Sequence, residues 1–354
     1  MKPPSRYYFR VNTLRIDPGS LLDELRGEGY TIFRDEEIEE ALWAPIEGPF
    51  ELPRDVDCKV VVDKRTAESV LLGANVYKPG IVAVDKCLKP GREVIVVSEN
   101  GIEVAYGVSR ISWNEIKGKG LAVEIIVSRF KSISLRDTKY HREGLIYEQS
   151  LPSMYVAHVL SPEKGSTIVD MCAAPGGKTS HVLELIGGRA TVIAVDHSKS
   201  KLDRMKREIK RLGHERIVRL VKADSRYLDK DYPWLKADYV ILDPPCTALG
   251  VIPKIYDKKS LRDVKSLSEY QRQFLRTASR ILKPCGILVY STCTLTIEEN
   301  ERNIIYAVEE LGFELEDAYP RRGSRGIGMS EAQRFHPHVH STPGYFIARL
   351  RRKC

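Results

Sequence analysis

The pattern of apolar and polar positions changes twice along the 354 residues. At the start, an apolar strand at 8–12 precedes an amphipathic helix at 18–28, which predicts a small α+β part. Between about 56 and 130, one short helix at 66–72 accompanies β-rich runs at 60–62, 81–84, 93–97, 102–108 and 121–127. Turn signals such as Asn100-Gly101 separate these runs and favour hairpins. The segment therefore predicts a compact β-barrel-like module.

From about residue 165, apolar runs of strand length alternate with longer helical patterns. These runs lie at 167–170, 191–196, 217–221, 239–243 and 287–290. Continuous apolar strands between helices indicate a parallel sheet covered on both faces, which places this part in the α/β class. Ligands of such sheets bind at the carboxyl ends of the strands. We therefore expect the functional site at that edge.

Composition narrows the class of protein. The net charge is +8, although residues 1–53 carry six basic and eleven acidic groups, while 199–222 hold ten basic and three acidic. No apolar run is long enough for a membrane span, and the N-terminus lacks the apolar stretch of a signal peptide. Seven widely separated cysteines, without a CxxC pair, indicate neither a secreted disulfide framework nor zinc. We expect a soluble, cytoplasmic, monomeric protein of several domains, and the basic excess is compatible with nucleic acid.

A glycine-rich turn follows the first strand of the α/β part and opens a helix. Gly176 and Gly177 allow a ligand to approach the backbone. The run from Gly177 to Thr179 also resembles the end of a nucleotide phosphate loop, but that motif requires glycine where Cys172 stands. A nucleoside triphosphatase therefore remains only an alternative.

The next two strands each end at an acidic residue. Asp196 can accept hydrogen bonds from ribose hydroxyls, or it can cap the helix that follows. Asp224 can accept a hydrogen bond from an adenine amino group. Together with the glycine turn, these carboxylates predict an adenosine ligand without a triphosphate, and S-adenosyl-L-methionine fits.

Two cysteines follow the last two strands at the same edge. The fourth strand leads into Asp243-Pro244-Pro245-Cys246, where the prolines make a stiff turn, and Cys293 follows the fifth strand. Carbon 5 of cytosine accepts a methyl group once a thiolate has added to carbon 6, and a second cysteine can assist release of the product. Asp243 can stabilise the charge that forms at N3. Either cysteine could be the nucleophile on this pattern alone, and either alone is more often a buried apolar residue.

These motifs resemble those of the NOP/Sun family of RNA cytosine-5 methyltransferases, from about residue 144 to 350. The resemblance also rests on 290–294, on 298–301 and on 337–348. It implies a Rossmann-like methyltransferase domain that uses S-adenosyl-L-methionine, with Cys293 as nucleophile, Cys246 in product release, and Asp243 and Lys178 beside the reacting base. The implied contacts to cofactor or base are Cys172, Ala173, Ala174, Pro175, Gly176, Gly177, Lys178, Asp196, Lys201, Asp224 and Asp243. Thr247-Ala248 replaces the Ser-Gly that commonly follows Cys246 in the family, which leaves the geometry of this loop open.

Residues 71–81 and 105–107 resemble a PUA RNA-binding module. A PUA module within a NOP/Sun enzyme implies the subgroup that methylates cytidine 72 in the acceptor stem of tRNA, with the PUA module on the CCA end. The expected domains are an N-terminal α+β part (1–55), PUA (56–131), a linker or remainder of the N-terminal part (132–164) and methyltransferase (165–354). Expected RNA contacts are Gly73, Asn75, Lys78, Arg321, Arg322 and Arg325.

Some alternatives stay open. An enzyme acting on ribosomal RNA and a non-catalytic RNA-binding assembly factor would share most of these features. His336, His338 and His340 alternate and could line one face of a strand, but no cysteine or acidic residue accompanies them, so we expect no metal. The basic run 199–222 is either a track for phosphates or the solvated face of a helix.

Overall fold

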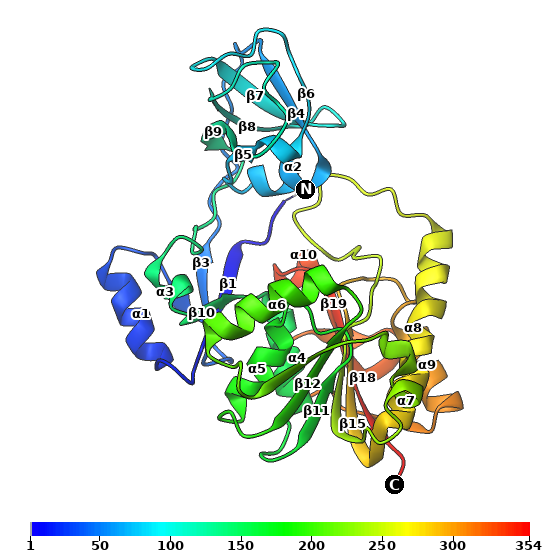
Figure 1. Ribbon diagram of the computed structural model, residues 1–354. Helices are drawn as coiled ribbons and strands as arrows, with labels where there is room; N and C mark the ends of the chain where they lie inside the picture. Colours follow the sequence, from blue (N-terminus) through cyan, green and yellow to red (C-terminus); the bar gives the residue numbers. More distant parts are fainter. Residues whose placement is uncertain (1) are drawn as a thin grey trace. The chain divides into compact units, whose positions relative to one another are not determined.

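The computed structural model describes residues 2–354, which form two compact units (Figure 1). The first contains the residues up to Tyr7, Ala44–Ile133 and Ile252–Lys258. The second contains Tyr8–Trp43, Ser134–Val251 and Lys259–Cys354. Each unit is therefore built from three separate stretches of chain.

The first unit holds a six-stranded sheet in the order β5-β9-β8-β7-β4-β6. Its strands are β4 (Lys59–Val62), β5 (Val76–Tyr77), β6 (Ile81–Val84), β7 (Glu93–Ser98), β8 (Glu103–Ser109) and β9 (Leu121–Ser128). Helix α2 (Lys64–Val70) begins at Asp63, whose side chain accepts the amide hydrogen of Thr66, and a single 3₁₀ turn, η1, spans Lys78–Gly80. Ile255, from the stretch 252–258, is buried in the core of this unit. The strand-rich module predicted from the sequence is confirmed.

The second unit is centred on a nine-stranded sheet. Strands β11 (Thr167–Asp170), β12 (Thr191–Asp196), β13 (Val218–Lys222), β14 (Ala237–Leu242) and β15 (Leu282–Thr292) are parallel, in the order β13-β12-β11-β14-β15. The sheet continues beyond β15 with antiparallel strands: β16 (Phe313–Glu316), β17 (Ser324–Gly326), β18 (Met329–Phe335) and β19 (Tyr345–Arg352). The parallel half was predicted, whereas the antiparallel half was not.

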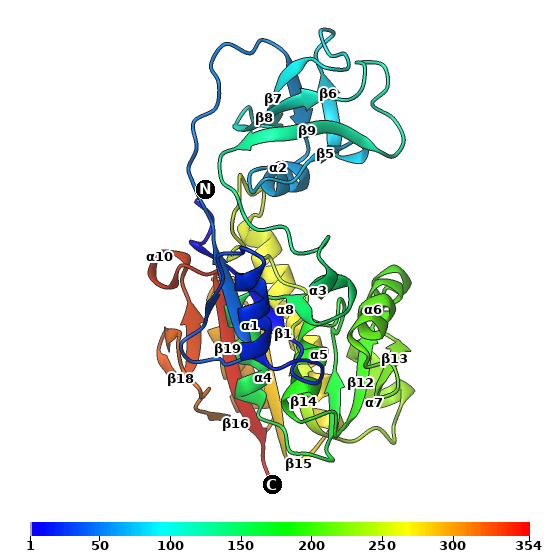
Figure 2. The ribbon, with the colours of Figure 1, turned by 90° about the vertical axis from the view of Figure 1, so that its left-hand side faces the viewer.

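Side chains alternate between two hydrophobic cores, one on each face of this sheet. Ile168 points into one core and its neighbour Val169 into the other. Helices α4 (Leu151–Leu160), α5 (Gly177–Leu185) and α6 (Lys199–Leu212) bury residues in the first core, and α7 (Leu228–Asp231), α8 (Leu261–Ile281) and α9 (Glu301–Glu310) in the second (Figures 1 and 2). The sheet is thus covered on both faces, as predicted. Within residues 2–354, no helix is long and apolar enough to cross a membrane.

A small four-stranded sheet carries the N-terminal part. Its strands are β1 (Arg6–Val11), β2 (Phe33–Arg34), β3 (Ala41–Pro45) and β10 (Ile146–Glu148), in the order β10-β1-β3-β2, and α1 (Pro18–Gly27) and α3 (Lys139–Arg142) accompany it. Arg10 on β1 is fully buried, forms an ion pair of 2.8 Å with Glu184 of α5, and donates a hydrogen bond of 2.8 Å to the Gly177 carbonyl. Since α5 starts at Gly177, Arg10 holds the start of the helix that follows the glycine-rich turn.

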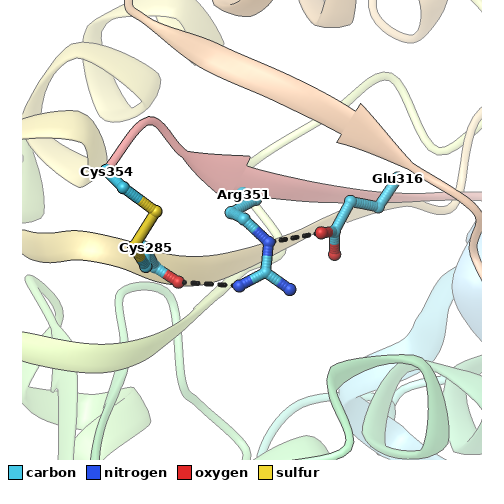
Figure 3. The surroundings of a disulfide bond; sticks show 4 residues. All are labelled: Cys285, Glu316, Arg351 and Cys354. Carbon is cyan, nitrogen blue, oxygen red and sulfur yellow. Dashed lines mark hydrogen bonds and ion pairs between the residues drawn. A yellow bond between two sulfur atoms is a disulfide. The ribbon is translucent and has the colours of Figure 1, made fainter.

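Four of the seven cysteines form disulfides, which was not expected from their spacing. Cys58 pairs with Cys87, and Cys285 with Cys354. The partners lie 29 and 69 residues apart in sequence, but the fold brings their Cα atoms to 6.0 and 4.6 Å. Figure 3 shows Arg351 beside the second disulfide, where it donates to the Cys285 carbonyl at 3.2 Å and pairs with Glu316. This disulfide fastens the C-terminal residue to β15.

Replacing Cys354 by serine is expected to lower the free energy of unfolding by about 2–4 kcal/mol, because the crosslink restricts the unfolded chain over a long loop. Thermal unfolding with and without a reductant measures the effect. The reductant should lower the melting temperature of the wild-type protein more than that of the variant. Equal melting temperatures for the variant and the non-reduced wild type would show that this crosslink adds no stability.

Candidate active site

A cavity of about 230 Å³ lies at the carboxyl ends of the parallel strands in the second unit. Its lining brings together residues that are far apart in sequence. They are Met171, Cys172, Ala174, Asp196, His197, Lys201, Asp224, Ser225, Asp243, Pro244, Pro245, Cys246, Ala248, Phe274 and Cys293. The edge of the sheet predicted to hold the site therefore does contain a cavity.

The turn after β11 forms one wall of this cavity. Asp170 is buried and accepts hydrogen bonds from the Thr179 hydroxyl (2.7 Å) and the Cys172 amide (3.4 Å), and burial raises the pKa of its carboxyl to about 6. Gly176 has a φ of +109°, and a Cβ there would lie 3.2 Å from Met205 Cγ. The turn therefore requires glycine at 176, and its tight path exposes backbone groups to a ligand.

The remaining residues of this turn face a second cavity, of about 220 Å³. It is lined by Tyr147, Glu148, Gln149, Ser150, Ser153, Asp170, Cys172, Ala173, Ala174, Pro175, Gly177, Lys178 and Asp243. Cys172, Ala174 and Asp243 border both cavities, so the residues predicted to contact cofactor or base divide between two adjoining spaces, except Gly176, which lines neither.

The two acidic residues of the adenosine prediction differ in their surroundings. Asp196 is buried, accepts the Ser198 amide hydrogen at 2.9 Å, and lies 4.0 Å from the Lys201 ammonium. The residue that caps α6 is Ser198, so the cap alternative for Asp196 is wrong. The Asp224 carboxylate accepts hydrogen bonds from the Arg226 guanidinium, which holds its pKa below the usual range. Both carboxylates reach the cavity, and Asp224 is held by direct hydrogen bonds from Arg226, whereas the cationic neighbour of Asp196, Lys201, lies farther away.

The two cysteine sulfurs lie 3.4 Å apart in this cavity. The hydrogen bond between them lowers the pKa of Cys293 and raises that of Cys246 well above its usual value. Burial and the Asp243 charge raise the pKa of both thiols, but the Lys178 ammonium lowers that of Cys293. The pair therefore favours a Cys293 thiolate that accepts a hydrogen bond from a Cys246 thiol. This difference between the two thiols could not be read from the sequence.

Lys178 and Asp243 form an ion pair beside the cysteines. The Lys178 ammonium also lies 5.6 Å from the ring centre of Tyr345. The carboxylate and the ring hold the ammonium close to Cys293. Tyr345 lies in the sequence stretch 337–348, where no single residue was predicted to act at the site.

The structure shows the geometry of the loop after Cys246, where Thr247-Ala248 replaces the Ser-Gly common in the family. Ala248 has a φ of +56°, the left-handed conformation that glycine adopts with little strain. The amide of Gly250 then donates to the Cys293 carbonyl at 2.9 Å, so the loop closes onto the other cysteine turn. Alanine is thus accommodated at a position suited to glycine.

Replacing Ala248 by glycine is expected to leave the free energy of unfolding unchanged or to raise it by up to about 1 kcal/mol. Relief of the left-handed strain, about 1–2 kcal/mol, offsets the backbone entropy lost by glycine on folding, about 0.4–1 kcal/mol. Chemical denaturation measures the difference. Ala83→Gly in the ordinary strand β6 is the control and should be destabilising. If Ala248→Gly lowered the free energy of unfolding as much as Ala83→Gly does, Ala248 would not be strained.

The three arginines expected to contact RNA differ in their contacts within the protein. Arg321 pairs with Asp317 and donates to the Ala332 carbonyl at 2.8 Å, and Arg322 lies 3.3 Å from Glu37. These two arginines, expected to contact phosphates, are therefore engaged within the protein, whereas Arg325 is exposed.

The strand predicted around the three alternating histidines is wrong. Residues 337–340 form a short helix, α10 (Pro337–His340), and His340 Nδ1 accepts the His336 amide hydrogen at 2.8 Å.

The residues of the first unit that were predicted to contact RNA lie in turns. Gly73 has a φ of +103° and Lys78 begins η1, while the Asn75 side-chain carbonyl accepts the Ile125 amide hydrogen at 2.8 Å. Asn75 therefore has a structural partner.

One polar cluster had no signal in the sequence. His158 and His181 both lie 2.7 Å from the same oxygen of Glu40, and burial lowers the pKa of His181 to about 4. At that separation both contacts are hydrogen bonds, in which an imidazole N–H of each histidine donates to the Glu40 carboxylate. The cluster joins α4 and α5 to the N-terminal sheet across more than a hundred residues of sequence.

Comparison with known proteins agrees with the architecture of both units. Residues 157–351 match the family model described as 16S rRNA methyltransferase RsmB/F, and residues 58–128 match the PUA domain. The chain is 43% identical over 356 residues to the tRNA (cytosine(72)-C(5))-methyltransferase of Pyrococcus horikoshii, covering 99% of this chain and 90% of that protein. It is 32% identical over 395 residues to the human tRNA (cytosine(72)-C(5))-methyltransferase NSUN6, covering 99% and 84%.

A solved structure is similar over the same extent. The crystal structure of NSun6 from Pyrococcus horikoshii with SFG has a TM-score of 0.93 and 43% identity, and covers 99% of this chain and 91% of that one. The resemblance found in the sequence motifs thus extends over the whole chain.

Proposed function

Because the chain belongs to the RsmB/F, or NOP/Sun, family of S-adenosylmethionine-dependent RNA methyltransferases and carries a PUA domain, we propose that it methylates carbon 5 of cytidine 72 in tRNA through a covalent cysteine adduct. The observation that carries the proposal is the pair of sulfurs 3.4 Å apart in a cavity lined by strand-end carboxylates. Relatives that match along almost the whole chain and are named for this tRNA position support the choice of substrate.

The residues present suit S-adenosyl-L-methionine. The buried Asp196 carboxylate offers acceptors for ribose hydroxyls, and the turn after β11 contributes Cys172 and Ala174 to the cavity wall. Met171, Cys172 and Phe274 supply apolar surface, and Asp224 reaches the same cavity. When bound, the cofactor supplies an electrophilic methyl group on a sulfonium. The protein has to bring the target carbon to that methyl group and make it nucleophilic.

The cysteine pair supplies that nucleophilicity. The Cys293 thiolate adds to carbon 6 of cytosine: a carbon–sulfur bond forms, the carbon 5–carbon 6 double bond opens, and N3 takes up a proton from water while carbon 5 becomes nucleophilic. Asp243 stabilises N3 during this addition, and Lys178 fixes Asp243. After methylation, carbon 5 and N3 give up their protons to water, the electron pair left at carbon 5 restores the double bond to carbon 6, and the carbon–sulfur bond breaks, so that Cys293 leaves as the thiolate. Cys246, protonated and within hydrogen-bond distance of the departing sulfur, assists this release.

The PUA domain supports a tRNA end as the substrate. It occupies residues 58–128, and the proposal assigns it to the CCA end next to position 72. Cytidine 72 lies within the acceptor stem, so it has to leave its stack, at a cost of a few kcal/mol that is smallest for weakly paired bases.

The test is methylation of tRNA transcripts with labelled S-adenosylmethionine. We expect 5-methylcytidine at position 72 and no label in a transcript with uridine at that position. Ribosomal RNA and total RNA are tested in parallel. Label in ribosomal RNA alone would replace the tRNA proposal by the ribosomal alternative, and no 5-methylcytidine in any RNA would reject methyl transfer to cytosine.

A further inference from the structure

Glu299 is a buried carboxylate that lies between the turns following the two cysteines. Its Oε1 accepts hydrogen bonds from the Thr247 amide (2.9 Å) and the Gln271 side chain (3.0 Å). Its Oε2 accepts from the hydroxyls of Thr247 (2.6 Å) and Thr296 (2.8 Å). Because a buried charge is costly unless it is well hydrogen-bonded, these contacts make the carboxylate a fixed point of the structure.

The contacts connect both cysteines to this one carboxylate. Thr247 directly follows Cys246, Thr294 directly follows Cys293, and their hydroxyl oxygens lie 2.7 Å apart. Since the Thr247 hydroxyl donates to Glu299, it has to accept from Thr294. The Thr294 hydroxyl also lies 3.4 Å from Glu299 Oε2, so the Cys293 turn reaches the carboxylate both directly and through Thr247.

The opposite side of the carboxylate is also held. The Gln271 side-chain amide that donates to Glu299 donates as well to the Pro245 carbonyl at 2.9 Å, just before Cys246. The Tyr290 hydroxyl donates to the Glu299 carbonyl at 2.6 Å, so the backbone of Glu299 is tied to β15. Both turns are therefore bonded to Glu299, although Glu299 itself does not line the cavity.

We infer that Glu299 is a positioning residue that keeps the two cysteine sulfurs in contact, and so acts on both formation and release of the covalent adduct. Its catalytic consequence rests on the proposed function, whereas its effect on the two thiols does not. Misplacement of reacting groups by about 1 Å can cost about 100-fold in rate. Loss of this carboxylate should therefore slow methyl transfer without a matching change in cofactor binding.

The pKa of the Cys293 thiol distinguishes two ways in which Glu299 could act: by positioning Cys246, or only as a nearby negative charge. If Glu299 acted only as a nearby negative charge, its removal would make the thiolate easier to form, and the pKa of Cys293 would fall. If Glu299 holds Cys246 as a hydrogen-bond donor to Cys293, its removal weakens that bond, and the pKa of Cys293 rises. The two possibilities predict opposite signs.

The experiment compares Glu299→Gln with Glu298→Gln, the same change one residue away at a partly exposed residue that pairs with Arg302 at 3.6 Å. Alkylation of Cys293 by iodoacetamide, followed by mass spectrometry across pH, reports the thiolate without RNA or cofactor. We expect the midpoint of Glu299→Gln to move to higher pH and that of Glu298→Gln to stay at the wild-type value. Methylation should show kcat lowered about 10- to 100-fold in Glu299→Gln, with the KM for S-adenosylmethionine nearly unchanged.

Thr247 provides a second pair of variants in case Glu299→Gln folds poorly. Thr247→Ser keeps the hydroxyl and should retain the wild-type alkylation midpoint, whereas Thr247→Val keeps the shape without the hydroxyl and should raise it. A midpoint in Glu299→Gln and Thr247→Val that is unchanged, or moved to lower pH, would overturn the inference. If the wild-type enzyme methylates no RNA, the proposed function fails, but the alkylation midpoints still decide whether Glu299 positions the thiols.

Discussion

Cys293→Ala is expected to reduce methyl transfer by about 10⁴-fold or more, the scale of losing a covalent nucleophile. Cys246→Ala is expected to keep the attack and to lose efficient release, so that a covalent protein–RNA adduct accumulates. The reason is the asymmetry of the pair: the pKa of Cys293 is lowered by its hydrogen bond with Cys246, and that of Cys246 is raised. The Lys178 charge favours the thiolate at Cys293.

Denaturing gel electrophoresis of each variant with tRNA and S-adenosylmethionine measures the adduct, and label in 5-methylcytidine measures turnover. Cys172→Ser controls for the loss of a cysteine from the same cavity and should form no accumulating adduct. An adduct in Cys293→Ala and none in Cys246→Ala would exchange the two roles.

Lys178→Met is expected to lower kcat by about 10²- to 10³-fold, within the range for removing one charged group that stabilises a transition state. It should also move the alkylation midpoint of Cys293 to higher pH. The sign follows from two effects with the same direction. The lost ammonium no longer lowers the pKa of Cys293, and the Asp243 carboxylate, left without its partner, raises that pKa further. At a fixed pH below the midpoint, fewer molecules then hold the thiolate.

The double variant Lys178→Met/Asp243→Asn separates these two effects. Removing both charges should bring the alkylation midpoint back toward the wild-type value, but activity should stay low, because Asp243 is needed at N3. A midpoint in Lys178→Met equal to that of the wild type would show that the ammonium does not support the thiolate.

Residues that face the cavity could largely be predicted from the sequence, because each follows a recognisable strand. Asp196, Asp224, Asp243 and Cys246 all come after apolar runs, and the parallel order places the ends of those runs at one edge. Four of the five strands were predictable because their apolar residues form continuous buried runs, whereas β13, at the edge of the sheet, is only partly buried and contains Arg219.

Residues that act through long-range pairing could not be predicted. Arg10 meets Glu184 across 174 residues, and Glu40 meets His181 across 141. The spacing of apolar and polar residues in the sequence gives no sign of such pairs. Among the antiparallel strands that were missed, β19 pairs with β15 and β16 from distant parts of the chain, whereas β17 and β18 are short neighbours that include charged residues and no continuous apolar run. Arg322 was assigned to RNA from its Gly-rich surroundings, but acidic residues of the N-terminal part compete for it.

The division of the chain into alternating stretches constrains how the protein can be taken apart. The backbone passes between the two units five times. A single proteolytic cut at any one passage therefore leaves the PUA-containing unit attached. Deleting residues 44–133 alone would leave the stretch 252–258 in place. Ile255 would then lose the apolar core that buries it, and its amide would lose its hydrogen bond to Glu68. A usable truncation has to replace all three stretches of the first unit at once, and loss of activity after deletion of 44–133 alone would report on exposed Ile255 rather than on loss of RNA recognition.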